Sequence, residues 1–190
     1  RLGSLAEAVE VDASSPDAMQ HLFEDVKQRW GSFDIFVANA AIGQHAPLAL
    51  ISAEQVDRMF ATNYRGILFS VKAAAELMTE HGSIIVVGST ASVAAPQGMS
   101  VYGGLKAALR GSLEAWVKDL AGSGIRVNIL SPGAVDTPSL RGAFAKASGA
   151  DKVDAMIASI AERSPARRIG SPREIGNVAA FLASDAASYI

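Results

Sequence analysis

Two residues with acid–base chemistry, Tyr102 and Lys106, lie four positions apart in the small-residue stretch SVYGGLKAAL, residues 100–109. Residues four apart are stacked neighbours on one face of a helix. A free tyrosine has a pKa of about 10, so its phenol exchanges protons poorly at neutral pH. A nearby ammonium favours the phenolate and moves this pKa toward the working range of general acid–base catalysis. The pair therefore predicts a proton donor or acceptor.

Ser89 is a third candidate, because it comes at the carboxyl end of the apolar run GSIIVVGSTAS, residues 82–92. A hydroxyl at that place would hold a carbonyl or alcohol oxygen against the phenol. Each residue also has an ordinary structural interpretation: Tyr102 as a helix-surface aromatic, Lys106 as a solvated charge and Ser89 as a turn residue. The Tyr–Lys spacing alone is a weak motif.

The elements that must position these residues follow from the hydrophobic pattern. Strands are predicted at residues 8–12, 33–41, 82–92 and 125–133, and the run at 33–41 suits a strand buried on both faces. Helices are predicted at 15–30, from 52 to 78, at 100–120 and at 171–184, with a helical flap over 137–163. Ser15 and Ser171 suit helix caps, because each precedes a proline that fits the first turn.

Strands that alternate with helices of this length imply right-handed crossovers and a parallel sheet covered on both faces. In such a sheet, ligands bind beyond the carboxyl ends of the strands. This rule selects four places: Asp12, Asn39-Ala40-Ala41, Gly88-Ser89 and Ser131-Pro132-Gly133. The chemistry should converge there.

Composition limits the class of protein. The chain has 190 residues, 49% hydrophobic and 19% charged, which suits one well-buried domain. Its net charge of −2 gives no reason to expect nucleic acid or an anionic membrane surface as a partner. It has no cysteine, no ligand-like spacing of its three histidines and no apolar run of membrane-spanning length. We therefore expect no metal and no membrane association, and a cytoplasmic location, with which the lack of cysteine is compatible.

The sequence resembles the short-chain dehydrogenases/reductases over essentially its whole length. Ser89, thirteen residues before Tyr102, and Lys106, four residues after it, match the family's Ser…Tyr-x-x-x-Lys constellation. ANAA at 38–41 is similar to the Asn-Asn-Ala-Gly strand end, TNYRG at 62–66 to the Asn-x-x-Gly motif, and SPGAVDTP at 131–138 to the Pro-Gly-x-x-x-Thr segment. GIRVN at 124–128 is also typical. The resemblance implies an α/β fold with a doubly wound, Rossmann-like parallel sheet, in one domain over residues 1–190.

The resemblance assigns catalytic roles. Tyr102 would be the proton donor or acceptor, and Ser89 would position the substrate oxygen. Lys106 would lower the Tyr102 pKa and bond the nicotinamide ribose of NAD or NADP. Asn63 would hold a water that continues the proton relay; its alternative role is a hydrogen bond that stabilises a helix kink.

Other residues would border the cofactor. Asp12 would meet the adenine, although a lone acid at a strand end is otherwise often a cap. Asn39 would brace the central strand, with Ala40 and Ala41 passing close to the cofactor. The nicotinamide and its amide or phosphate groups would be bordered by Pro132, Gly133, Val135 and Thr137.

Two departures from the family pattern bear on the cofactor. The family's strand-end glycine is Ala41 here, which we expect to reshape the site slightly. The glycine-rich turn that sets the pyrophosphate on a helix N-terminus is not found before Asp12 or elsewhere in the sequence. The predicted strands match family strands 3 to 6, so strands 1, 2 and 7 are missing. We therefore expect a longer protein, with roughly 45 residues before Arg1 and about 15–20 after Ile190.

The implied function is an NAD(P)-dependent oxidoreductase that interconverts a secondary alcohol and a ketone or aldehyde. An epimerase or dehydratase of the same superfamily, and a non-catalytic cofactor-binding sensor, are the alternatives. The choice between NAD and NADP is left open. Family members usually pair through the helices that here begin near Ser52 and Ser100, so we expect a homo-oligomer, a dimer or tetramer.

Several residues around the predicted pocket have two interpretations. The flap would offer apolar contacts to a small-molecule alcohol or carbonyl substrate, or would be anchored to the core by the same side chains: Leu140, Phe144 and Met156. His45 would reach the pocket rim. Gly103 and Gly104 would keep bulk away from the helix face where cofactor and substrate meet. The stripe on that helix would face either a partner subunit or the sheet: Leu105, Leu109, Leu113 and Trp116.

Overall fold

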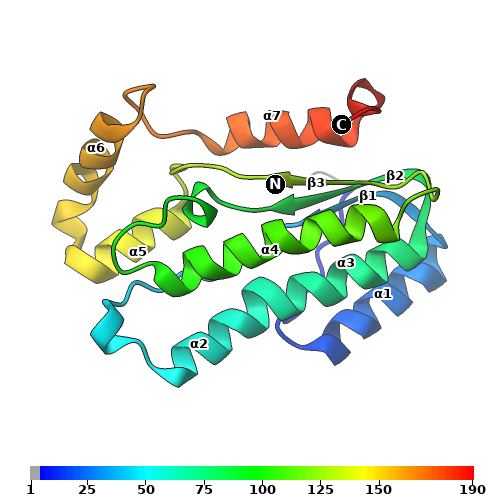
Figure 1. Ribbon diagram of the computed structural model, residues 1–190, viewed down its shortest axis with the longest axis horizontal. Helices are drawn as coiled ribbons and strands as arrows, with labels where there is room; N and C mark the ends of the chain where they lie inside the picture. Colours follow the sequence, from blue (N-terminus) through cyan, green and yellow to red (C-terminus); the bar gives the residue numbers. More distant parts are fainter. Residues whose placement is uncertain (1–4) are drawn as a thin grey trace.

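The computed structural model describes residues 5–190, which are arranged in layers around a parallel sheet (Figure 1). Its strands are β1 (Phe33–Ala38), β2 (Met78–Val87) and β3 (Arg126–Leu130), hydrogen-bonded in that order and all parallel. Helices α1, α3 and α4 lie on one face of the sheet and α7 on the other. The predicted α/β fold with a parallel sheet between helices is confirmed. Among the described residues, no helix has the length and apolar character that crossing a membrane would need.

The helices begin and end close to their predicted positions: α1 Pro16–Trp30, α2 Ala53–Phe60, α3 Ile67–Leu77, α4 Ser100–Asp119, α5 Pro138–Ser148, α6 Val153–Arg163 and α7 Pro172–Ala183. The Ser15 hydroxyl caps α1 by accepting a hydrogen bond from the Ala18 N–H. Ser171 and Glu174 form a complete capping box at the start of α7. The predicted caps are therefore confirmed.

The core forms around β2, the central strand. Ile84, Ile85 and Val86 have no exposed surface, because successive side chains of a central strand point to opposite faces and both are covered. Burial of such side chains stabilises the fold by roughly 1.5–3 kcal/mol each. On the side of α3 and α4, β2 packs in a cluster with Ala38, Ile67, Val71, Leu109 and Val127.

The prediction that β1 is buried on both faces is wrong. Phe36 and Ala38 point toward the helices and pack in the core, whereas Ile35 and Val37 are 50% and 43% exposed. Among the described residues, β1 is an edge strand, and α7 packs over β2 and β3 rather than over β1. One face of β1 is therefore left uncovered.

Residues 8–12 are also not a strand, contrary to the sequence prediction. They run without a ladder partner in the described sheet, whose edge is β1. Val11 packs against the small cluster of Met19, Phe23 and Ala74 beneath α1. The Asp12 carboxylate accepts hydrogen bonds from the Ser14 N–H and hydroxyl, so this segment serves as the lead-in to α1.

The apolar stripe of α4 faces the sheet. Leu109 is fully buried, and Leu113 and Trp116 pack against the same cluster. The interpretation of this stripe as part of the core is confirmed for these three residues, whereas the half-buried Leu105 is not in this cluster. Self-association of the chain stays a prediction.

A π-helical segment, Ala61–Gly66, joins α2 and α3. It ends at Gly66, which is buried against the backbone just before α1. A methyl group added at Gly66 would overlap the Ala13 carbonyl oxygen. The π-helical segment can therefore lie this close to the start of α1 only because Gly66 has no side chain.

Gly66→Ala should destabilise the protein by about 2–3 kcal/mol, because backbone on both sides prevents the methyl group from being accommodated. Gly111→Ala on α4 is the matched control, since no atom lies within 4 Å of the added methyl. It should be neutral or stabilising by up to about 1 kcal/mol, as expected for a helix interior. Urea denaturation of both variants measures the difference, and equal unfolding free energies would contradict this account.

Candidate active site

The loops that follow the three strands gather at one end of the molecule, beside α5 and α6, and α4 begins there (Figure 1). Ser89 comes two residues after β2, and Tyr102 and Lys106 lie in the first two turns of α4. The predicted catalytic residues therefore meet where the strand-end rule placed them.

Gly103 allows α4 to approach the segment that follows Ser89. A methyl group at Gly103 would lie 2.6 Å from Ala95 Cβ and 2.8 Å from the Ala91 carbonyl oxygen. Any side chain would push α4 away and separate Tyr102 from Ser89. The role predicted for Gly103, access of cofactor and substrate, is wrong, because the missing side chain makes room for the protein's own backbone. Gly104 has no atom within 4 Å of its added methyl group.

Lys106 is buried, with 2% of its surface exposed. Its Nζ donates a hydrogen bond of 2.6 Å to the Val87 carbonyl, the last residue of β2. Burial disfavours the charged ammonium and lowers the pKa of Lys106 to about 8. The interpretation of Lys106 as a solvated charge is therefore excluded.

Tyr102 is close to both Ser89 and Lys106. The Lys106 Nζ is 5.8 Å from the centroid of the Tyr102 ring, and the Ser89 hydroxyl interacts with the phenol. Burial raises the pKa of Tyr102, and the Ser89 hydroxyl opposes this only in part. The expected lowering of the Tyr102 pKa by Lys106 is not found, because the ammonium is held by the Val87 carbonyl instead of the phenol oxygen. Tyr102 is thus protonated at neutral pH, the form that donates a proton.

Asn63 lies in the π-helical segment and is completely buried. Its amide pairs with the backbone of Ile42: Nδ2 donates to the carbonyl oxygen at 2.7 Å, and Oδ1 accepts from the N–H at 2.8 Å. Asn63 therefore fixes the loop after β1 to the helix below it. The predicted water relay stays a prediction.

The predicted cofactor residues after β1 lie on the surface at this end. Asn39, Ala40 and Ala41 are all exposed. Asp12 is exposed too, and its hydrogen bonds with Ser14 lower the pKa of its carboxyl group. These contacts form a turn before α1, whose cap is Ser15, and the adenine contact of Asp12 stays a prediction.

The residues after β3 have mostly structural contacts. The Pro132 carbonyl accepts from the Thr90 N–H at 3.0 Å, and the Thr137 hydroxyl caps α5 by accepting from the Leu140 N–H at 3.1 Å. Val135 pairs with Gly170 in an isolated parallel bridge, which closes the base of the flap. Gly133 is exposed, with no atom within 4 Å of an added methyl group.

Arg141 connects the two helices of the flap, a role that the sequence did not indicate. It binds both carboxylate oxygens of Asp136 at 2.6 and 2.9 Å, and Asp154 on α6 at 3.0 Å. These partners raise the pKa of Arg141 and keep it charged. Because Asp136 lies between Val135 and Thr137, the network also fixes the backbone of the predicted nicotinamide segment.

His45 lies in the loop after β1 and covers Gly98 in the loop before Tyr102. A methyl group at Gly98 would meet the imidazole, with Cδ2 at 2.6 Å, and the Ala46 N–H donates to the Gly98 carbonyl at 2.9 Å. Gly98 has a φ of +75°, which also favours glycine. Sequence reasoning missed Gly98, and its one signal is the Gln-Gly pair four residues before Tyr102.

A family model described as Enoyl-(Acyl carrier protein) reductase matches residues 1–190. An oxidoreductase of Sarocladium schorii, asL5, is 37% identical over 191 residues that span the whole chain and 74% of the relative. The chain belongs to the short-chain dehydrogenase/reductase family.

Solved structures agree with this assignment. Ligand-free aldohexose dehydrogenase of Thermoplasma acidophilum superposes with a TM-score of 0.91 at 27% identity, covering 100% of this chain and 77% of that one. A short-chain dehydrogenase of Burkholderia cenocepacia in complex with NADP gives a TM-score of 0.84 at 29% identity, covering 96% and 71%. The predicted fold and family are confirmed.

The low pKa of Lys106 predicts how stability changes with pH in this family member. The folded pKa of about 8 lies below the ordinary value of 10.5, so between these values the unfolded chain binds the extra proton and stability rises with pH. From pH 8 to pH 10, the unfolding free energy of the wild type should rise by about 2 kcal/mol relative to that of Lys106→Met.

Urea denaturation at intervals across this range measures the change, and the other groups that titrate there, Tyr102 included, are present in both proteins. Lys118→Met removes an exposed lysine from the same helix and is the matched control. Parallel stability curves for the wild type and Lys106→Met would contradict the buried, destabilised ammonium.

Proposed function

We propose that the protein is an NAD(P)-dependent oxidoreductase that interconverts a small-molecule secondary alcohol and its ketone or aldehyde, with Tyr102 as the acid or base. The observation that carries this proposal is a phenol close to both the Ser89 hydroxyl and a buried lysine ammonium. Neither a surface aromatic nor a turn serine requires a charged group to be buried beside it. The desolvation of Lys106 costs stability, which points to a role in the chemistry.

The described residues fit the nicotinamide half of the cofactor. Ala40, Ala41 and Gly133 leave small, exposed surfaces at the strand ends, and no atom lies within 4 Å of an added methyl at Gly133. Lys106 would bond the nicotinamide ribose. Pro132, Val135 and Thr137 would border the ring, held in place by the flap base and the Arg141 network. The NADP complex of the Burkholderia cenocepacia relative supports this class of cofactor.

Fewer of the described residues would contact the adenine half of the cofactor. The sequence contains no glycine-rich turn for the pyrophosphate, and Asp12, exposed beside α1, would meet the adenine. The proposal therefore leaves the choice between NAD and NADP open.

In the reductive direction, Ser89 and Tyr102 would both donate hydrogen bonds to the carbonyl oxygen of the substrate. This polarises the carbonyl carbon, to which the bound cofactor supplies a hydride. Tyr102 would then transfer its proton to the oxygen, and the raised pKa of Tyr102 ensures that the proton is present at neutral pH. In the oxidative direction, the same phenol must lose its proton before it acts as a base.

Lys106 would make that loss possible. Its ammonium lies over the Tyr102 ring but is bonded to the Val87 carbonyl, so it would stabilise the phenolate by turning toward the phenol oxygen as the proton leaves. Its own pKa of about 8 also permits it to release a proton near neutral pH. Asn63, which fixes the loop beside this site, would hold the water that carries the proton to solvent.

Tyr102→Phe should reduce kcat for carbonyl reduction by at least about a hundredfold, because the general acid is lost. NADH and NADPH affinity, measured by nucleotide fluorescence, should change by less than about threefold, since the phenol oxygen is not a main cofactor ligand. Tyr64→Phe is the matched control: it removes a hydroxyl that bonds Ser112, between the π-helical segment and α4.

Turnover is measured by NAD(P)H oxidation with a panel of ketones and aldehydes. Activity of Tyr102→Phe equal to that of Tyr64→Phe would refute the acid–base role. Cofactor binding by the wild type without turnover of any carbonyl would favour a sensor, and conversion of a substrate without net cofactor oxidation would favour an epimerase or dehydratase.

A further inference from the structure

Two of the three loops that border the predicted reaction centre contain no Asp, Glu, Lys or Arg. These loops, residues 42–52 after β1 and 88–99 after β2, are called the rim below. No Asp, Glu, Lys or Arg occurs in either of them, although 19% of the chain is charged. Loops at the surface normally carry such residues because charges are well solvated there. Their absence from both loops at the same end of the sheet is therefore informative.

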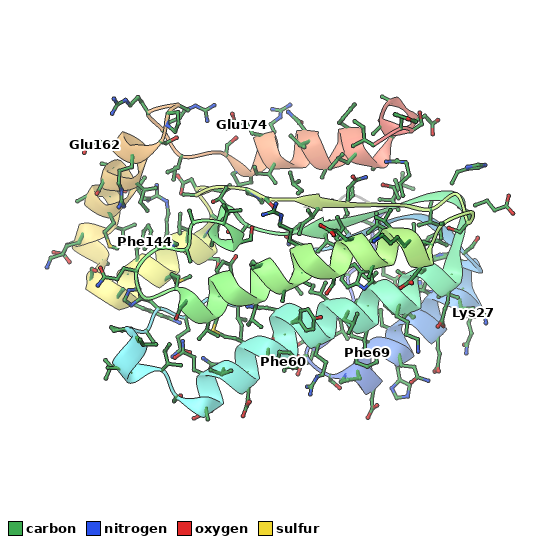
Figure 2. The ribbon with its side chains drawn as sticks, viewed as in Figure 1. Lys27, Phe60, Phe69, Phe144, Glu162 and Glu174 are labelled. Carbon is green, nitrogen blue, oxygen red and sulfur yellow. The ribbon has the colours of Figure 1, made fainter. Side chains whose placement is uncertain are left out.

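The rim also exposes large apolar side chains. Leu48 is 84% exposed, Leu50 72% and Val93 75%. Single exposed apolar residues are ordinary, but these three lie on loops at the carboxyl edge of the sheet, where ligands bind. Figure 2 places a further apolar side chain, Phe144 of α5, at this same end of the molecule.

Two of the cations near the rim are held by the protein. Arg141 on α5 is held by two carboxylates, Asp136 and Asp154. Lys106 beneath the site is buried and bonded to the Val87 carbonyl. Arg58 on α2 is bonded to the neutral side chain of Gln44, and its exposed guanidinium keeps its charge. A carboxylate or phosphate next to the reacting carbonyl would thus have to compete with Asp136, Asp154 and the Val87 carbonyl for Arg141 and Lys106.

We propose that the site selects carbonyl substrates that are uncharged near the reacting carbon and apolar in body. This inference rests on the proposed function and adds the substrate class to it. An apolar body would cover Leu48, Leu50 and Val93, which gains hydrophobic free energy. A carboxylate on the same body would lose water without gaining a partner, so its transition state would be disfavoured. His45 is the one side chain of the rim that can carry a charge, and its ring packs against Gly98.

Three cyclohexanones with the same ring test the substrate class: 4-ethylcyclohexanone, 4-oxocyclohexanecarboxamide and 4-oxocyclohexanecarboxylate. The amide has nearly the shape of the carboxylate without its charge, so this pair isolates the effect of charge. We expect kcat/KM to fall in the order given, with the carboxylate at least about tenfold below the amide. Equal values, or a preference for the carboxylate, would overturn the proposal.

Binding of the same compounds to the protein, followed by ligand-observed NMR, separates this inference from the proposed function. The same order of affinity without turnover supports the substrate class and counts against the oxidoreductase. Turnover of the three ketones at equal rates supports the oxidoreductase and overturns the substrate class. Binding of none of them also overturns the substrate class.

A cation introduced on the rim gives the converse test. Val93→Arg should raise kcat/KM for the carboxylate relative to the amide by at least about tenfold, because the new guanidinium would pair with the substrate. Val117→Arg adds the same charge at the far end of α4, at a valine that is 48% exposed, and should leave the ratio unchanged. A ratio unchanged in Val93→Arg, or raised equally in both variants, would overturn the role of the rim.

Discussion

The hydrogen bond from Lys106 to the Val87 carbonyl is the contact on which the site depends. It joins the helix that carries Tyr102 to the end of the central strand, next to Ser89. Burial of an ammonium with one strong partner is unfavourable, and the low pKa of Lys106 expresses that cost. The rest of the fold must hold α4 close to the sheet in spite of it, and does so through Leu109, Leu113 and Trp116, which pack against β2 and its neighbours.

Close approach of backbone to backbone makes this arrangement possible. Gly103 allows α4 to lie against Ala91 and Ala95, and Gly66 allows the π-helical segment to lie against Ala13. Asn63 then fixes the loop after β1 by pairing with both backbone groups of Ile42, and His45 joins that loop to Gly98. Each contact restrains the position of one segment near the carboxyl edge of the sheet. The geometry of the candidate site is therefore set by contacts with backbone as well as by the proposed catalytic side chains.

Sequence patterns were sufficient for the parts that local chemistry determines. Capping serines and prolines placed the starts of α1 and α7, and the spacing of Ser89, Tyr102 and Lys106 indicated three residues that the fold brings close together. Strand pairing and burial depend on which elements lie beside and over each strand, and the sequence pattern did not predict them. Residues 8–12 have the composition of a strand but no neighbour to bond within the described sheet, and β1 is apolar on a face that no described helix covers.

The same limit explains why the pKa of Tyr102 is raised, although the sequence predicted that Lys106 would lower it. Sequence spacing places an ammonium near the phenol but does not show which oxygen that ammonium bonds, and here it is the Val87 carbonyl. Likewise, Arg141 is an unremarkable surface residue until Asp136 and Asp154 are brought to it by the folding of the flap. Long-range partners decide the electrostatics, and they come from tertiary structure alone.

The uncharged rim and the buried lysine have a common physical consequence. Charges interact more strongly where water is scarce, and an apolar substrate body over Leu48, Leu50 and Val93 would exclude water from the reaction centre. The rim itself carries no Asp, Glu, Lys or Arg, so the Lys106 ammonium beneath it, 5.8 Å from the Tyr102 ring centroid, would be less screened by water. A charged substrate would disturb this field as well as lose its own hydration. Selection for neutral substrates and control of the Tyr102 proton would thus follow from one distribution of charge.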